Sequence, residues 1–82
     1  MPTVLRFGAF RVMIYINDHR PAHVHVFARG REAVLILNCW SGPPEVRENY
    51  GFSRPEMRQI RQSVTAHLQL VCEAWKEIYG QA

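Results

Sequence analysis

The chain has 82 residues, of which 48% are hydrophobic and 21% are charged. This length suits one domain, so it excludes two-domain enzymes, (β/α)₈ barrels and full dinucleotide-binding folds. Ten basic and seven acidic residues give a net charge of +3, which permits a nucleic-acid partner without requiring one. We therefore expect a single globular domain that spans residues 1–82.

Four segments have the residue composition and alternation of β-strands: residues 3–7, 10–16, 23–28 and 32–38. Gly8 and Ala9 separate the first two segments, which is the spacing of a tight hairpin. Arg29 to Arg31 supply a turn before the fourth segment. Residues 39–51 contain two glycines and two prolines, so they predict a long connection with at most a short extended piece around Val46.

The strongest local pattern in the chain predicts a helix over residues 54–79. Ser53 and Glu56 have the spacing of a capping box, and Gly80 is a typical stop signal. Between them, apolar positions recur at steps of three and four: Met57, Ile60, Val64, His67, Val71, Ala74 and Ile78, widened by Leu68 and Trp75.

These elements predict an α+β fold, in which a small antiparallel sheet of three to four strands packs against one long C-terminal helix. A helix of about 25 residues would be ~38 Å long, which exceeds the width of a four-stranded sheet. Part of its apolar stripe would then project beyond the sheet. We therefore expect the chain to form a homodimer.

The two cysteines, Cys39 and Cys72, are far apart in the sequence, and two cysteines are too few for a zinc knuckle. We expect them to be reduced rather than joined in a disulfide. No stretch resembles a signal peptide, and the longest apolar run, residues 33–37, is too short to span a membrane. The sequence thus predicts a cytoplasmic protein with no membrane partner.

Three of the four histidines lie in the segment NDHRPAHVHV, residues 17–26. Because strand side chains alternate between two faces, His23 and His25 should point to the same face, with Cα atoms about 6.5–7 Å apart. Asp18 and His19 precede them in a polar loop, where they can approach the same point. This segment is therefore the candidate site, and several interpretations of it remain open.

In a metal interpretation, His19, His23 and His25 hold a divalent ion such as zinc or iron. In a nuclease interpretation that needs no cofactor, His23 and His25 act as acid and base on RNA while Arg20 offsets charge on the phosphate. In a binding interpretation, a partner protein or single-stranded nucleic acid contacts the exposed histidines and Asp18, together with Arg20, Arg29, Phe27 and Tyr15. In a structural interpretation, the histidines bond to loop carbonyls and Asp18 caps the turn.

Two further features lie on the predicted helix. His67 falls on the apolar stripe, where a hydrogen-bonded core residue is the favoured interpretation. The alternative is that it faces the sheet and approaches the strand histidines as a further binding residue. Arg54, Arg58 and Arg61 line one flank at steps of four and three. A solvated helix face is the favoured interpretation of these arginines, ahead of a track for phosphates.

The motif resembles that of a family of small, uncharacterised bacterial and phage proteins that is classified only as a domain of unknown function. The resemblance rests on Tyr15, Asn17, Asp18, His19, Pro21, His23 and His25, on Arg47, Glu48, Asn49, Gly51 and Ser53, and on His67 and Trp75. It covers nearly the whole chain. Ala22 replaces a usual proline, and Ala66 replaces a usual glutamate, which weakens any scheme that needs a carboxylate beside His67.

The resemblance implies a small partner protein, encoded in a neighbouring gene, in a toxin–antitoxin-like pair. We therefore predict a small binding module that recognises this partner, with RNA as a further target, through Asp18, His19, Arg20, His23, His25 and His67. Two alternatives are kept: a metal-independent ribonuclease that uses His23, His25 and Arg20, and a metal-binding accessory domain.

Overall fold

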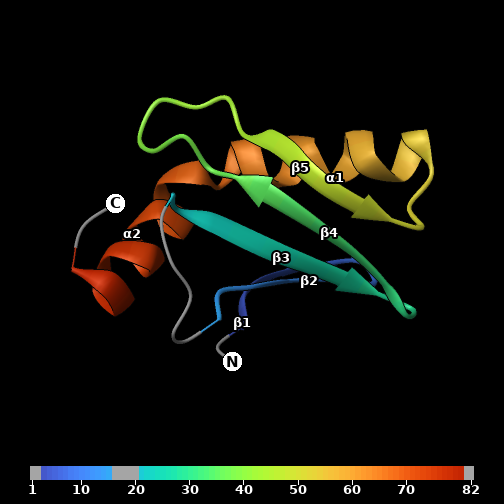
Figure 1. Cartoon of the computed structure of the whole chain (residues 1–82), viewed down its shortest axis with the longest axis horizontal. Helices are drawn as coiled ribbons and strands as arrows, with labels where there is room; N and C mark the ends of the chain where they lie inside the picture. Colours follow the sequence, from blue (N-terminus) through green and yellow to red (C-terminus); the bar gives the residue numbers. More distant parts are fainter. Residues whose placement is uncertain (1–2, 16–20, 81–82) are drawn as a thin grey trace.

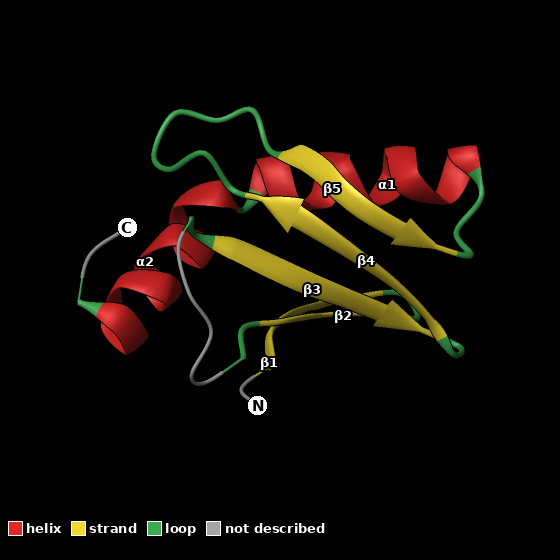
Figure 2. Ribbon diagram, viewed as in Figure 1, coloured by secondary structure: helices red, strands yellow, loops and turns green. Residues whose placement is uncertain are grey.

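A computed structural model describes residues 3–15 and 21–80 of the chain. These residues form five strands and two helices: β1 (Thr3–Phe7), β2 (Phe10–Met13), β3 (His23–Ala28), β4 (Arg31–Ile36), β5 (Glu45–Tyr50), α1 (Arg54–Ala66) and α2 (Leu68–Tyr79). The strands make one antiparallel sheet in the order β1-β2-β3-β4-β5, and the helices form a second layer (Figures 1 and 2). The α+β class is confirmed, but the sheet has a fifth strand and the predicted helix is two helices.

The core lies between the helices and one face of the sheet. In β3, Val24 and Val26 point into this core, while His23, His25 and Phe27 alternate to the other face. The helices contribute apolar residues at helical spacing, as the periodicity predicted. The residues with no measurable exposure include Val12, Ile14, Leu35, Leu37, Ile60, Val64, Val71 and Trp75. No helix in the described residues is long and apolar enough to cross a membrane.

Strand β5 corrects the expectation of a long loop over residues 39–51. All six of its residues are exposed, and its sequence, EVRENY, carries polar side chains on both faces. It therefore lacks the apolar alternation by which strands are recognised. The backbone pairing with β4 makes it a strand, from Ile36 opposite Glu45 to Glu32 opposite Tyr50. Pairing with β4 therefore determines the secondary structure of this segment, which its side-chain pattern does not indicate.

His67 divides the predicted helix into α1 and α2. Its backbone has φ −117° and ψ 24°, and its Nδ1–H donates to the Ser63 carbonyl at 2.9 Å. The helices have 13 and 12 residues, so each is about 20 Å long rather than ~38 Å. The longest dimension of the molecule is 33 Å. Since two helices of about 20 Å replace one of ~38 Å, the argument from helix length no longer supports a homodimer, which stays a prediction.

The start of α1 is capped as predicted. The Ser53 hydroxyl accepts from the Glu56 backbone N–H, and the Ser53 N–H donates to the Glu56 carboxylate at 2.9 Å. The backbone N–H of Ser53 is the main reason that the pKa of Glu56 lies below its usual value of 4.5, and the Arg31 guanidinium, 3.0 Å away, lowers this pKa further. These contacts fix the first turn of α1 against β4.

A tight turn connects β5 to α1. The side-chain amide of Asn49 donates to the Phe52 carbonyl and its oxygen accepts from the Phe52 N–H, both at 3.0 Å. Gly51 has φ +102°, and a Cβ atom there would lie 2.8 Å from Cγ of Arg31. The turn therefore requires glycine, and it sends α1 back along β5. Figure 1 shows α1 running beside β5.

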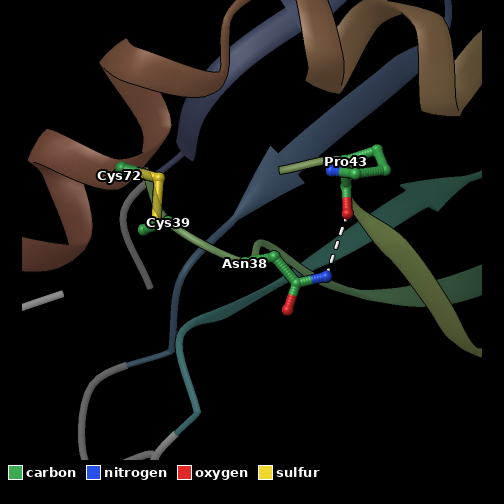
Figure 3. The surroundings of a disulfide bond; sticks show 4 residues. All are labelled: Asn38, Cys39, Pro43 and Cys72. Carbon is green, nitrogen blue, oxygen red and sulfur yellow. Dashed lines mark hydrogen bonds between the residues drawn. A yellow bond between two sulfur atoms is a disulfide. The ribbon is translucent and has the colours of Figure 1, made fainter. Parts of the chain in front are cut away.

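A disulfide joins Cys39 to Cys72, so the expectation of reduced cysteines is wrong (Figure 3). Their sequence separation of 33 hides their closeness, because α2 folds back to place Cys72 with its Cα atom 5.9 Å from that of Cys39. In the same loop, the Asn38 amide donates to the Pro43 carbonyl at 2.9 Å. The disulfide removes the argument from reduced thiols for a cytoplasmic location, which stays a prediction.

Reduction of this disulfide should lower the free energy of unfolding by about 3 to 4 kcal/mol, because a cross-link across 33 positions restricts the unfolded chain. Urea unfolding followed by circular dichroism, with and without a reductant, measures the difference. The double variant Cys39→Ser, Cys72→Ser is the control, since a reductant should not change its stability. Equal stability of the native chain in both conditions would contradict this prediction.

Candidate functional site

The two strand histidines occupy different environments. His23, at the start of β3, is only 3% exposed, and its Nδ1–H donates to the Pro21 carbonyl at 2.7 Å. The ring of His25 is stacked on Tyr15, with centroids 3.8 Å apart and 7° between the planes. The Nδ1–H of His25 donates to the Glu32 carboxylate at 3.0 Å. His23 is thus an interior residue, whereas the His25–Glu32 pair reaches the surface.

Rings from the sheet and from α2 meet in one cluster. The Trp75 ring lies 5.3 Å from that of His23 and 4.2 Å from that of Tyr79. The Tyr79 hydroxyl donates to the backbone carbonyl of Tyr15, and the rings of His23 and His25 are 5.3 Å apart. We call this group the aromatic cluster; its members are Tyr15, His23, His25, Phe27, Trp75 and Tyr79. It ties α2 to the strand histidines.

Of the other predicted site residues, the structure places only His67, and His67 is not a member of this cluster. Asp18, His19 and Arg20 lie outside the described residues. His67 is exposed at the junction of the two helices, so the expectation that it faces the sheet is wrong. The break in the helix moves His67 off the apolar stripe, and Leu68 is buried instead. Trp75 takes the place beside His23 that was expected for His67.

Metal binding by His19, His23 and His25 stays a prediction. Within residues 3–15 and 21–80, no group of three or more histidine, cysteine or acidic side chains could hold a metal ion. The Nδ1 atoms of the two described histidines are already engaged, one by the Pro21 carbonyl and the other by Glu32. His19 lies outside the described residues.

A second feature is a groove of about 740 Å³ between β5 and α1, which we call the β5–α1 groove. Its apolar surface comes from the exposed Val46 and from Phe52 and Met57. Phe52 and Met57 are core residues that line the groove from below. Its polar lining consists of Arg54, Arg58, Arg61, Asn49, Gln62 and Thr65. Ala66 also lines the groove. The groove is therefore apolar at its base and positively charged along its helix side.

Helix periodicity explains this arrangement. Met57 and Ile60 face the sheet, so the arginines at steps of four and three fall together on the flank that borders β5. The described lining contains no histidine, cysteine or carboxylate. The groove therefore has apolar and cationic groups with which to bind a ligand.

The sheet face opposite the helices has the opposite charge beside β5. Cross-strand pairing places Glu32 beside Tyr50, and it places Glu45 and Glu48 on the same face. The Tyr50 hydroxyl donates to Glu48 at 2.9 Å, and this bond and the Glu48 charge raise the pKa of Tyr50 above its usual 10.0. Strand β5 thus separates an acidic surface from the arginines of the groove.

Comparison with known protein families places residues 9–76 in one of them, described as a domain of unknown function, DUF4160. The chain belongs to the DUF4160 family. This confirms the expectation of an uncharacterised domain family, while the DUF4160 description assigns no activity or partner. Searches of curated proteins and of solved structures found no match to this chain.

The sequence of this DUF4160 domain reveals only part of the groove. The spacing of Arg54, Arg58 and Arg61 was visible, but a solvated helix face was its favoured interpretation. Val46 and Asn49 were missed as site residues because the strand that holds them was not recognised. Only the pairing of β5 with β4 shows that an edge strand lies beside these arginines.

The two tryptophans provide a test of the aromatic cluster. Trp75 is fully buried, so Trp75→Ala should lower the free energy of unfolding by about 3–5 kcal/mol. Trp40 is 44% exposed, and Trp40→Ala should change it by about 0.5 kcal/mol or less. Urea unfolding of both variants measures the contrast. Equal losses of stability in the two variants would contradict the described packing. If Trp75→Ala does not fold, Trp75→Phe replaces it in the comparison.

Proposed function

We propose that this DUF4160 domain is the partner-binding module of a two-protein, toxin–antitoxin-like pair, and that the β5–α1 groove binds the small protein encoded in a neighbouring gene. The resemblance described above suggests the pair. The observation that carries the proposal is the groove itself, in which three arginines border an apolar surface beside an edge strand. Arginine and buried apolar anchors are the residue types on which protein interfaces most depend.

The form of the groove favours a macromolecular partner over a small substrate. Arg54, Arg58 and Arg61 are all exposed, so the groove is open along the helix rather than enclosed. Pockets for small ligands bury most of the ligand surface, which an open groove does not do. An exposed strand edge beside it adds main-chain donors and acceptors that a protein partner can pair with.

Co-expression with the neighbouring gene tests this proposal. The chain should co-purify with the neighbour's product, and the double variant Arg58→Glu, Arg61→Glu should lose it, because charge reversal in the groove repels the partner. The control variant Arg6→Glu, Arg11→Glu makes the same change in net charge on the exposed residues of β1 and β2 and should retain the partner. Retention by the groove variant, or equal loss by the control, would contradict the proposal.

One observation favours the ribonuclease alternative at a different place. The Glu32 carboxylate accepts from Nδ1–H of His25, which selects the tautomer whose Nε2 is basic, and stacking on Tyr15 orients the ring. In this proposal, His25 is the general base on RNA and Arg20 contacts the phosphate. The buried ring of His23, bonded to Pro21, then supports the site instead of acting as the second acid.

Cleavage of a labelled single-stranded RNA in the presence of a chelator tests this alternative. His25→Gln should reduce the cleavage rate by about 10²–10⁴-fold, because the base is removed. His67→Gln, which changes an exposed histidine that is not a member of the aromatic cluster, should leave the rate unchanged. Absence of cleavage by the unmodified chain would eliminate the alternative, and so would equal cleavage by His25→Gln.

A further inference from the structure

We infer that the β5–α1 groove takes an acidic segment of the partner protein, in which glutamate or aspartate alternates with apolar residues and which lies extended along the outer edge of β5. This inference rests on the proposed function and names the chemistry of the partner. It follows from three features of the groove: uncompensated arginines, an apolar base and an available strand edge.

The arginines carry positive charge that the described structure does not balance. No ion pair among the described residues involves Arg54, Arg58 or Arg61. Glu56, the acidic residue in the first turn of α1, is paired with Arg31 of β4 instead. Three neighbouring guanidinium groups attract carboxylates, with which they form paired hydrogen bonds.

The spacing of these charges fits an extended segment. Arg54 and Arg61 are about 10 Å apart along the helix axis, at 1.5 Å per residue. Alternate residues of a strand are about 6.6–6.8 Å apart, so two or three acidic residues at alternate positions span the same length. Their intervening neighbours point the other way. The methylene groups of the acidic side chains, which lie on the groove side, can contact the apolar surface of Val46 and Met57.

Strand β5 offers a backbone edge to such a segment. It lies at the end of the sheet and pairs on one side, with β4, in the described part of the chain. The register shifts between Val34 and Leu35, so Arg47 is the extra residue of a bulge. A bulge and charged side chains discourage indiscriminate pairing with other edges. The arginines of the groove would then select an acidic segment over other strands.

Charge argues against a second copy of the chain, and the small exposed ring surface argues against RNA. A second copy paired through its own β5 edge, about a two-fold axis perpendicular to the sheet, would place its α1 on the same face and bring its Arg58 and Arg61 towards those of the first copy, which repels it. Single-stranded RNA would satisfy the arginines, but it binds mainly by stacking on exposed rings. Phe52, the only aromatic residue in the described lining, is 6% exposed and offers little ring surface.

Two synthetic peptides test the inference with the full chain. One alternates glutamate with valine over about eight residues, which is roughly 27 Å when extended and covers β5. The other has lysine in place of every glutamate. Fluorescence anisotropy of labelled peptides measures binding, and amide chemical shifts locate it. The acidic peptide should bind at least about tenfold more tightly than the basic one and shift the amides of β5 and α1.

The charge variants complete the design. Arg58→Glu, Arg61→Glu should weaken binding of the acidic peptide about tenfold or more, whereas Arg6→Glu, Arg11→Glu should have a much smaller effect despite the same net charge. Equal binding of both peptides, shifts outside β5 and α1, or tighter binding of a short RNA to the same groove would overturn the inference.

Failure of the inference is distinguishable from failure of the proposed function. If the neighbour's product co-purifies through Arg58 and Arg61 but the acidic peptide does not bind at β5, the proposed partner is supported and the proposed acidic segment is wrong. If the acidic peptide binds as expected but the neighbour's product does not co-purify, the groove specificity stands and the proposed partner falls.

Discussion

The paired hydrogen bonds between Asn49 and Phe52 determine where α1 lies, and the main surface feature of the domain depends on them. They close the turn that follows β5, at a glycine whose backbone conformation and lack of a side chain leave room for Arg31. Arg31 in turn bonds to Glu56 in the first turn of α1 and lies 5.3 Å from the Phe52 ring centroid. The helix is therefore held alongside the edge strand, and the groove forms between them.

The histidine motif has a structural role in this arrangement. His23 is buried against Trp75, and Tyr79 bonds to the backbone of Tyr15, so the aromatic cluster fastens α2 to the sheet. The Cys39–Cys72 disulfide fastens the same helix to the loop after β4. A motif that looks like a cluster of catalytic or metal-binding groups thus supplies packing as well. In the described part of the motif, His25 also makes a polar contact near the surface, with Glu32.

Local patterns predicted those parts of the fold whose side chains are divided between an apolar and a polar face. The alternation in β3 placed His23 and His25 on one face, and the spacing of Ser53 and Glu56 located the start of α1. The same reasoning failed for β5, because its stability comes from backbone pairing with β4 and not from burial. The prediction also failed at His67, where α1 ends. A break between two helices leaves the spacing of their apolar residues almost unchanged, so the sequence pattern does not reveal it.

The sequence by itself determined the α+β class, the two faces of the central strands and the presence of a histidine motif, since these depend on neighbours within a few residues. Tertiary structure decided which distant residues meet. It brought Cys39 to Cys72, set Trp75 instead of His67 beside His23, and placed three helix arginines next to an edge strand. The physical reason is that these contacts depend on the direction in which each turn sends the next element, and that direction is fixed by packing across the whole domain.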